Sequence, residues 1–292
     1  MEMVDIDGNN STLLYFETLS ELANLQVDPL NEEEWREQVN NKEREHSWFG
    51  MKGIAEVREA CELYGWDAGM EKGLAAFASL TAPQLPSLKR KRCYSSGGHT
   101  FDMQRLYSGK PEKAWRTSRR EQSENKMAHK GLVNIVVNIA ANCGVSADAF
   151  FWRGALAMLY AKALMESGRR ARILAVMPVD RWVQSNPHDK KGDSHLMIAV
   201  EVKAYGQALN LGSMFAMTAL SGFFRYYGFK AILSTPFKVS GGLGTSVSVK
   251  NELLEPLLDD SPALVIENIW SQEAAMAKSV DFTKELMGEE AR

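Results

Sequence analysis

The clearest hydrophobic pattern lies in the middle of the chain. Residues 132–139 form a β-branched apolar run, residues 140–146 are small or polar, and residues 147–167 show the period of an amphipathic helix. Gly168 ends the helical pattern, and residues 172–177 form a second apolar run. Strand, helix and strand in this order predict a right-handed βαβ unit with parallel strands.

Three further strands and one apolar helix are predicted in the C-terminal half. The strand patterns cover residues 196–203, 229–234 and 263–270, and the helical pattern covers residues 211–227. Ser271 is expected to cap a final helix, because a serine hydroxyl accepts hydrogen bonds from the free N–H groups of a first turn. With the central unit, this order predicts an α/β fold with a mainly parallel sheet flanked by helices.

The N-terminal part shows a mainly helical pattern. Helices are predicted over residues 12–25, 53–64 and 70–80, and Gly65 is placed to end the second of them. Proline, glycine and basic residues crowd the stretch 81–98, which is typical of a flexible segment. The predicted organisation is a helical N-terminal region over 1–98, a linking segment over 99–130 and an α/β domain over 131–292.

Composition and charge narrow the classes of protein that fit. The chain has 292 residues, enough for a large core, and a formal net charge of −3, so no global attraction to nucleic acid or membranes is expected. No apolar run approaches the roughly 18 residues of a membrane span, and the polar, acidic start does not resemble a secretory signal. The 3 cysteines are widely spaced, which predicts a reducing cytoplasm without disulfides or a zinc site.

Polar groups follow the predicted strands at the edge where parallel sheets bind ligands, beyond the carboxyl ends of the strands. The candidate ligand-binding residues at this edge are Asn138, Asn142, Ser146, Asp180 and His188. Asp and His side chains suit metal binding or acid–base chemistry, whereas a solvated loop is the alternative for residues 180–195. No nucleotide-binding glycine pattern, P-loop or serine nucleophile elbow is present, so no catalytic residue, metal ligand or cofactor is assigned.

Basic residues gather in two stretches near the middle of the chain, with Tyr94 and Trp115 beside them. They are Lys89, Arg90, Lys91, Arg92, Arg116, Arg119 and Arg120. Phosphate contacts combined with aromatic stacking are typical of single-strand nucleic-acid binding, whereas a short basic run near proline and glycine is also typical of an exposed loop. The nucleic-acid hypothesis predicts that the two stretches converge on one face, and it fails if they lie on opposite sides.

The helix predicted over residues 211–227 is rich in Met and Phe and is apolar over more than one face. Such a stripe is typical of a core helix, and its extra width predicts that a protein partner or a second copy of the chain covers part of it. Cys143, in the turn of small residues, is expected to be a buried thiol, because the sequence places no base beside it.

The loop with Asn138, Ala140 and Asn142 resembles, in position, the metal-site loop of von Willebrand factor A domains. That family places an Asp-x-Ser-x-Ser pattern after its first strand and before a long helix. The carboxylate and both hydroxyls are absent here. The resemblance therefore implies Rossmann-like or von Willebrand A-like layering, with a degenerate loop that lacks the hard oxygen ligands of a metal site.

The order of several short motifs is similar to that of an uncharacterised protein family found mostly in bacteriophage genomes. These motifs are Phe16–Leu22, Trp48-Phe49-Gly50, Gly65-Trp66 with Gly69, Gly109-Lys110-Pro111-Glu112 and Arg153-Gly154-Ala155. The resemblance implies a phage origin and action in the host cytoplasm, and it carries over no catalytic residue. We expect a non-enzymatic binding or assembly protein. The alternatives are a nucleic-acid-binding accessory protein and a metal- or nucleotide-dependent enzyme.

Overall fold

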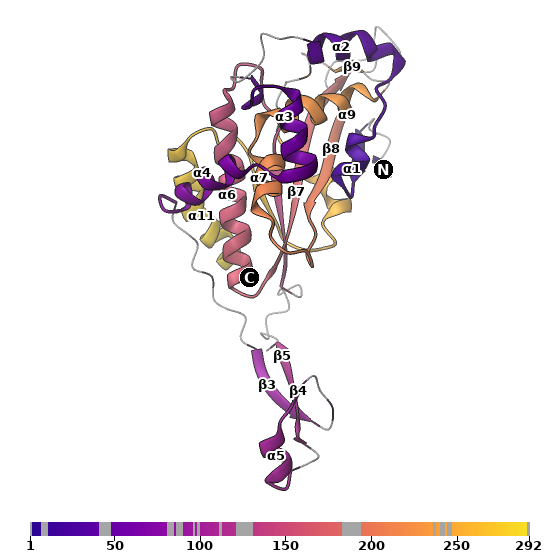
Figure 1. Cartoon of the computed structure of the whole chain (residues 1–292). Coiled ribbons are helices and arrows are strands. Elements are labelled where there is room, and N and C mark those ends of the chain that lie inside the picture. Colours follow the sequence, from indigo (N-terminus) through magenta and orange to yellow (C-terminus); the bar gives the residue numbers. More distant parts are fainter. Residues whose placement is uncertain are drawn as a thin grey trace.

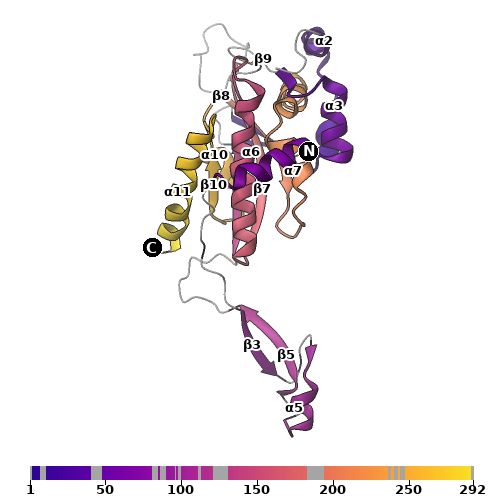
Figure 2. The ribbon, with the colours of Figure 1, turned by 60° about the vertical axis from the view of Figure 1, so that its left-hand side comes forward.

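A computed structural model describes the protein over residues 2–6, 11–40, 48–80, 85, 90–95, 97, 100–110, 113–120, 131–182, 194–235, 238–239, 243 and 247–290. At 2–6, 90–93, 117–120, 180–182, 194, 238–239 and 282–290 it describes the backbone. Figure 1 shows an α/β body and a small three-stranded sheet. Figure 2, turned by 60°, shows the small sheet apart from the body in a second view.

The body is built on a seven-stranded sheet in the order β1-β2-β8-β7-β6-β10, with β9 paired to β7. The strands are β1 (Glu2–Ile6), β2 (Ser11–Phe16), β6 (Leu132–Asn138), β7 (Arg170–Trp182), β8 (Ser194–Lys203), β9 (Lys238–Val239) and β10 (Ala263–Ile266). Three of the four neighbouring pairs from β2 to β10 are parallel, and the β7–β8 pair is antiparallel. The α/β class is thus confirmed, with a mostly parallel centre.

The helices of the body gather mainly on one face of this sheet (Figure 1). They are α1 (Leu19–Ala23), η1 (Pro29–Asn31), α2 (Glu32–Asn40), α3 (Ile54–Glu59), η4 (Ala60–Tyr64), α4 (Asp67–Phe77), α6 (Ala147–Glu166), α7 (Leu211–Thr218), α8 (Ser221–Phe223), η6 (Phe224–Gly228), α9 (Phe229–Leu233), α10 (Asn251–Leu254), η7 (Glu255–Leu257) and α11 (Gln272–Glu290). Within the described residues, none of these helices combines the length and apolar character needed to cross a membrane.

The central βαβ unit forms as predicted. β6 and β7 run parallel, and α6 connects them. Ser146 caps α6, since its hydroxyl accepts a hydrogen bond from the Ala149 N–H at 3.4 Å. Gly168 follows the helix with a φ of 85°, a conformation that glycine adopts without strain.

Close approach of helices explains a glycine in the middle of α6. A Cβ at Gly154 would lie 2.4 Å from the Ala219 Cβ and 2.8 Å from the Ala219 backbone. The helix α6 therefore packs against the end of α7 at a separation that only glycine permits.

The opposite face of the sheet is covered by a short segment. α10 and η7 place Leu253 and Leu257 in one apolar cluster with Val136 of β6 and Leu174 of β7. The strands are thus buried on both faces, as expected for the parallel part of a sheet.

The helix predicted over residues 12–25 is wrong in its first half. β2 occupies this half and pairs in parallel with β8, while α1 begins later with Thr18 as its N-cap. Leu13 belongs to the apolar cluster on one face and Leu14 to the cluster on the other. A strand buried on both faces lacks polar alternation, so its periodicity resembles that of a buried helix.

The strand predicted over residues 229–234 is also wrong, because α9 occupies this stretch. The helical backbone continues through Gly228 into α9. A Cβ there would lie 2.6 Å from the Met177 Sδ, so the glycine allows the helix to lie close to β7. The last predicted strand is shorter than expected, and Ser271 caps α11 as predicted, accepting from the Ala274 N–H at 3.2 Å.

The small sheet lies in the stretch that the sequence predicts to be flexible or linking. It contains β3 (Arg90–Ser95), β5 (Trp115–Arg120) and β4 (Thr100–Phe101), in this spatial order and with antiparallel pairing. α5 (Met103–Tyr107) follows β4, and Asp102 caps it by accepting from the Arg105 N–H at 3.3 Å. The basic run at 90–92 is therefore part of a strand rather than a loop.

Candidate functional site

β3 and β5 bring the two basic stretches of the sequence side by side. Their register places Arg90 opposite Arg120 and Lys91 opposite Arg119. Lys89, the first residue of the basic run, lies outside the described residues. The clusters expected to converge in a nucleic-acid-binding protein thus lie on neighbouring strands of one sheet.

Strand register assigns these positions to the two faces of the small sheet, because opposed residues share a face and successive residues alternate. The arginine face holds positions Arg90, Arg92, Tyr94, Arg116 and Arg120. The aromatic face holds positions Lys91, Ser95, Phe101, Trp115 and Arg119. Four of the seven predicted basic residues therefore occupy the arginine face.

Aromatic side chains lie at the end of the small sheet beside α5. On the arginine face, the Arg105 guanidinium of α5 lies 3.5 Å from the centre of the Tyr94 ring. On the aromatic face, the rings of Phe101 and Trp115 meet edge to face with centroids 4.9 Å apart. Basic and aromatic residues are thus interleaved, as in surfaces that bind nucleic acid by charge and stacking.

The stretch 89–120, here called the basic segment, differs in charge from the rest of the chain. It holds ten Lys or Arg residues and two acidic ones, Asp102 and Glu112, which gives a net charge of +8. Since the whole chain carries −3, the remainder carries −11. A polyanion is therefore attracted to one part of the molecule and repelled by the other.

The carboxyl edge of the large sheet has a topological switch point between β6 and β10. The strand order runs from β6 to β7 and β8 on one side and places β10 on the other. The Asn138 amide at this point donates to the Val247 carbonyl at 2.9 Å and to the Glu267 carboxylate at 3.4 Å. Its oxygen accepts from the Ala140 N–H at 3.1 Å. Asn138 therefore ties the loop after β6 to its neighbours.

Arg153 lies beneath the same loop and is 1% exposed. Its guanidinium donates to the carbonyl groups of residues 138–140, and the rings of Phe150 and Trp270 lie 4.8 and 4.3 Å from it. Burial, together with the like charge of Arg225, lowers the pKa of Arg153 to about 9, so the group stays protonated at neutral pH. A cation of the chain itself thus binds the carbonyls of this loop.

Two of the other predicted ligand-binding residues follow Asn138 in the loop after β6, and Asp180 lies apart from them on β7. Asn142 and Ser146 lie in the same loop, and Ser146 serves as the cap of α6. In the register of β6 and β7, Asn138 lies opposite Val176. Asp180 lies four residues beyond Val176 on β7, about 13 Å along the strand. His188 lies outside the described residues. In the part of the chain that the structure describes, no group of three or more His, Cys, Asp or Glu side chains is placed to hold a metal ion.

The Met- and Phe-rich segment 211–227 is internal core. Phe215 and Phe224 are fully buried, and the segment lies between the sheet and the helices α4 and α6. The chain itself therefore covers this segment, and the prediction that a partner covers it is wrong. Cys143 is exposed in the loop beyond β6, so the prediction of a buried thiol is wrong.

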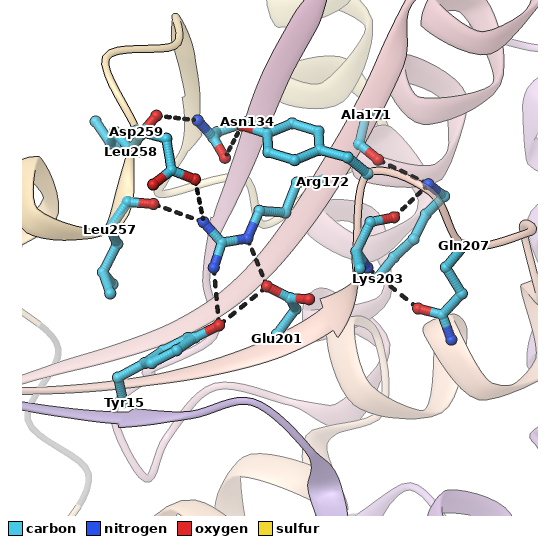
Figure 3. A network of polar contacts seen from close by, with 12 residues as sticks. Tyr15, Asn134, Ala171, Arg172, Glu201, Lys203, Gln207, Leu257, Leu258 and Asp259 are labelled. Carbon is cyan, nitrogen blue, oxygen red and sulfur yellow. Dashed lines mark hydrogen bonds and ion pairs between the residues drawn. The ribbon is translucent and has the colours of Figure 1, made fainter. Parts of the chain in front are cut away.

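A buried polar network lies at the opposite edge of the sheet, near the start of β7 (Figure 3). The Arg172 guanidinium donates to the Glu201 carboxylate at 2.5 Å, to the Leu257 carbonyl at 2.6 Å and to the Tyr15 hydroxyl at 2.8 Å. The Tyr15 hydroxyl donates in turn to Glu201 at 3.0 Å. Burial raises the pKa of Tyr15 to about 12, with Glu201 adding to the shift and Arg172 opposing it.

The same network extends across the sheet (Figure 3). The Lys203 ammonium donates to the carbonyls of Ala171 and Ala204 at 2.7 and 3.0 Å, and the Tyr205 hydroxyl donates to the Asn134 side chain at 2.8 Å. These contacts join segments that are far apart in the sequence. No local pattern in the sequence indicates these contacts. Their groups bind one another, which indicates a structural role.

Comparison with known proteins places the chain in one family. A family model described as a domain of unknown function, DUF7192, matches residues 6–290. The match confirms the expectation of an uncharacterised family over nearly the whole chain. No curated protein and no solved structure gives a significant match.

Proposed function

The chain belongs to the DUF7192 family, and we propose that it is a non-enzymatic nucleic-acid-binding protein. In this proposal the small sheet contacts the phosphate backbone and the α/β body serves as its platform. The observation that carries the proposal is the register of β3 and β5, which sets Arg90 opposite Arg120 and Lys91 opposite Arg119. Like charges opposed in this way destabilise a sheet, and a bound polyanion removes that cost.

The spacing of the basic positions supports a phosphate backbone as the ligand. Alternate residues of a strand, such as Arg90 and Arg92, are about 6.8 Å apart. Phosphates of one nucleic-acid strand repeat about every 3.4 Å along the helix axis. Basic residues at alternate positions of a strand therefore have a spacing of the same order as that of the phosphates.

Charge distribution supports binding at the small sheet rather than over the whole surface. The basic segment carries +8 and the remainder −11. Nucleic acid is therefore attracted to the small sheet and repelled by the body, which limits contact to one region.

The carboxyl edge of the large sheet supports a non-enzymatic role. The Asn138 amide and the two terminal nitrogens of the Arg153 guanidinium donate to carbonyl groups of the chain itself, and Glu267 accepts from Asn138. The Arg153 Nε is buried without a partner among the described residues. Side chains that bond to one another and to the backbone rigidify the structure around them, which supports a structural role for these groups. The enzyme alternative would need Asp180 near Asn138, whereas the strand register separates them.

Fluorescence anisotropy with labelled single- and double-stranded oligonucleotides tests the proposal. We expect the full chain to bind at about 50 mM salt and to bind far more weakly at about 200 mM salt. Absence of binding to both forms at the lower salt concentration would exclude nucleic acid as the ligand.

A pair of matched variants locates the site. The test variant changes Arg90, Arg92, Arg116 and Arg120 to Gln, and the control changes Arg36, Lys52, Arg58 and Lys162 to Gln. The control residues lie in exposed i,i+4 ion pairs on helices of the body or beside them. Both variants lose four positive charges. We expect about a tenfold or greater loss of affinity in the test variant alone, and equal losses would refute the assignment of the site.

The proposal also includes the setting that the sequence predicts. It comprises von Willebrand A-like layering of the body, a phage origin, action in the host cytoplasm, and a protein partner or homo-oligomer that contacts a surface other than the buried segment 211–227. The β6–α6–β7 unit followed by the antiparallel strand β8 supports the layering. Light scattering on the purified full chain tests the homo-oligomer, since a mass near the 32.6 kDa of one chain would exclude it.

A further inference from the structure

One face of the small sheet carries an exposed aromatic pair. Phe101 lies opposite Trp115 in the register of β4 and β5, and their rings meet edge to face with centroids 4.9 Å apart. Trp115 is 36% exposed and Phe101 is 37% exposed. Large aromatic side chains are mostly buried in folded proteins, so this pair forms an open apolar platform.

α5 distinguishes the two faces at this end of the sheet. Arg105 of α5 stacks on the Tyr94 ring at 3.5 Å, and Tyr94 shares the arginine face with Arg116. The Arg105 side chain of α5 therefore covers part of the arginine face at this end. Trp115, one position away from Arg116, belongs to the face on the other side.

Basic positions share the aromatic face with the ring pair. Arg119 lies four residues from Trp115 on β5, about 13 Å along the strand, and Lys91 lies opposite Arg119. The face thus combines an apolar end with a positively charged end.

We infer that the aromatic face binds unpaired bases of a single-stranded nucleic acid, which stack on Trp115 and Phe101 while phosphates contact the Lys91–Arg119 end. The inference rests on the proposed function and adds the form of nucleic acid that the site prefers. Unpaired bases expose their ring faces, and stacking on aromatic side chains holds them without regard to sequence.

A duplex fits this face less well. Its bases already stack on one another, and its grooves present only their edges. An exposed Trp ring on a sheet therefore adds little affinity for a duplex. Positive charges add affinity for both single strands and duplexes. The net charge of +8 in the basic segment favours a polyanion over an apolar protein partner.

Selective loss of single-strand binding tests the inference. In the full chain, Trp115→Ala should weaken binding to a labelled single strand roughly five- to hundredfold and leave duplex binding within about twofold. Trp115→Phe should retain most single-strand affinity, because it keeps a ring. Tyr64→Ala is the matched control, since Tyr64 is a 78% exposed aromatic residue on the body. Equal losses for single strand and duplex, or no loss in Trp115→Ala, would overturn the inference.

A second measurement on the unmodified protein avoids any folding defect in the variant. A single strand that contains bromouracil is crosslinked to the protein by light, and the adducts are mapped by mass spectrometry. We expect adducts on Trp115 or Phe101, and adducts confined to other peptides would contradict the inference. If the unmodified protein binds neither single strand nor duplex, the proposed function itself fails. If it binds both and Trp115→Ala binds equally well, only the aromatic-face inference fails.

Discussion

The Arg172 guanidinium and the Glu201 carboxylate form an ion pair of 2.5 Å between the neighbouring strands β7 and β8, with side chains only 9% and 16% exposed. The Tyr15 hydroxyl bonds to both groups and brings β2 into the same contact. The network thus joins β2 to the centre of the sheet.

Arg172→Met should destabilise the body strongly. The change leaves the Glu201 carboxylate and the Tyr15 hydroxyl buried without their cation, which costs about 3–5 kcal/mol in comparable buried pairs. The free energy of unfolding from urea titration measures the loss. Arg36→Met is the control, since its ion pair is exposed, and it should change stability by less than about 0.5 kcal/mol. A loss below about 1 kcal/mol in Arg172→Met would contradict the structural role.

The raised pKa of Tyr15 predicts that the free energy of unfolding falls at alkaline pH. Burial, with a contribution from Glu201 against that of Arg172, raises the pKa of Tyr15 to about 12 in the folded chain. A tyrosine in the unfolded chain ionises near pH 10. The protonated hydroxyl therefore stabilises the fold fully below about pH 10, and this contribution is lost as pH rises toward about 12.

Comparing the unmodified chain with Tyr15→Phe separates the contribution of Tyr15 to stability from the contributions of the other tyrosines. The variant lacks the ionising group, so the stability difference between the unmodified chain and Tyr15→Phe should shrink as pH rises from about 9 to about 12. Unfolding by urea at each pH gives the difference. A difference that stays constant over this range would show that Tyr15 ionises alike in the folded and unfolded chain.

Gly154→Ala tests the packing of α6 against the end of α7. The added methyl group would lie 2.4 Å from the Ala219 Cβ, so the two helices must move apart. We expect a loss of about 1–3 kcal/mol in the free energy of unfolding. Gly144→Ala is the control, because no atom lies within 4 Å of the added group. Equal stability of the two variants would mean that the helices are not packed so closely.

Arg153→Met tests whether the buried guanidinium holds the loop after β6. The variant keeps the volume but leaves the carbonyl groups of residues 138–140 without their donor, which should cost about 1–3 kcal/mol. Hydrogen exchange should accelerate at 139–145 more than in the strands. Lys162→Met, on an exposed turn of α6, is the control. Unchanged exchange at 139–145 in Arg153→Met would contradict this role.

Elements with a distinctive local pattern could be predicted from the sequence. The unit β6–α6–β7 has two apolar runs, a capping serine and a terminating Gly168, and it forms as expected. Periodicity does not separate strand from helix in β2 and α9, because both segments are short and almost entirely buried. Tertiary pairing with β8 decides the conformation of β2.

The candidate site was predictable in composition but not in geometry. The basic residues stand out in the sequence. Their arrangement depends on the pairing of β3 with β5, two strands that are separated in the sequence by β4 and α5. Consecutive basic residues normally indicate solvated loops, since like charges repel across a sheet. Arg153 and the Arg172 network could not be predicted, because their partners are distant in the sequence or are backbone carbonyls.

The salt dependence of duplex binding tests the central claim most directly. It compares the slope of log affinity against log salt for the unmodified chain and for the variant with Gln at Arg90, Arg92, Arg116 and Arg120. Each phosphate contact to a duplex contributes about 0.9 to the slope, so four lost contacts should make it shallower by about 3.6. A slope reduced by this amount supports the small sheet as the phosphate-binding surface. Equal slopes for the two proteins would contradict it.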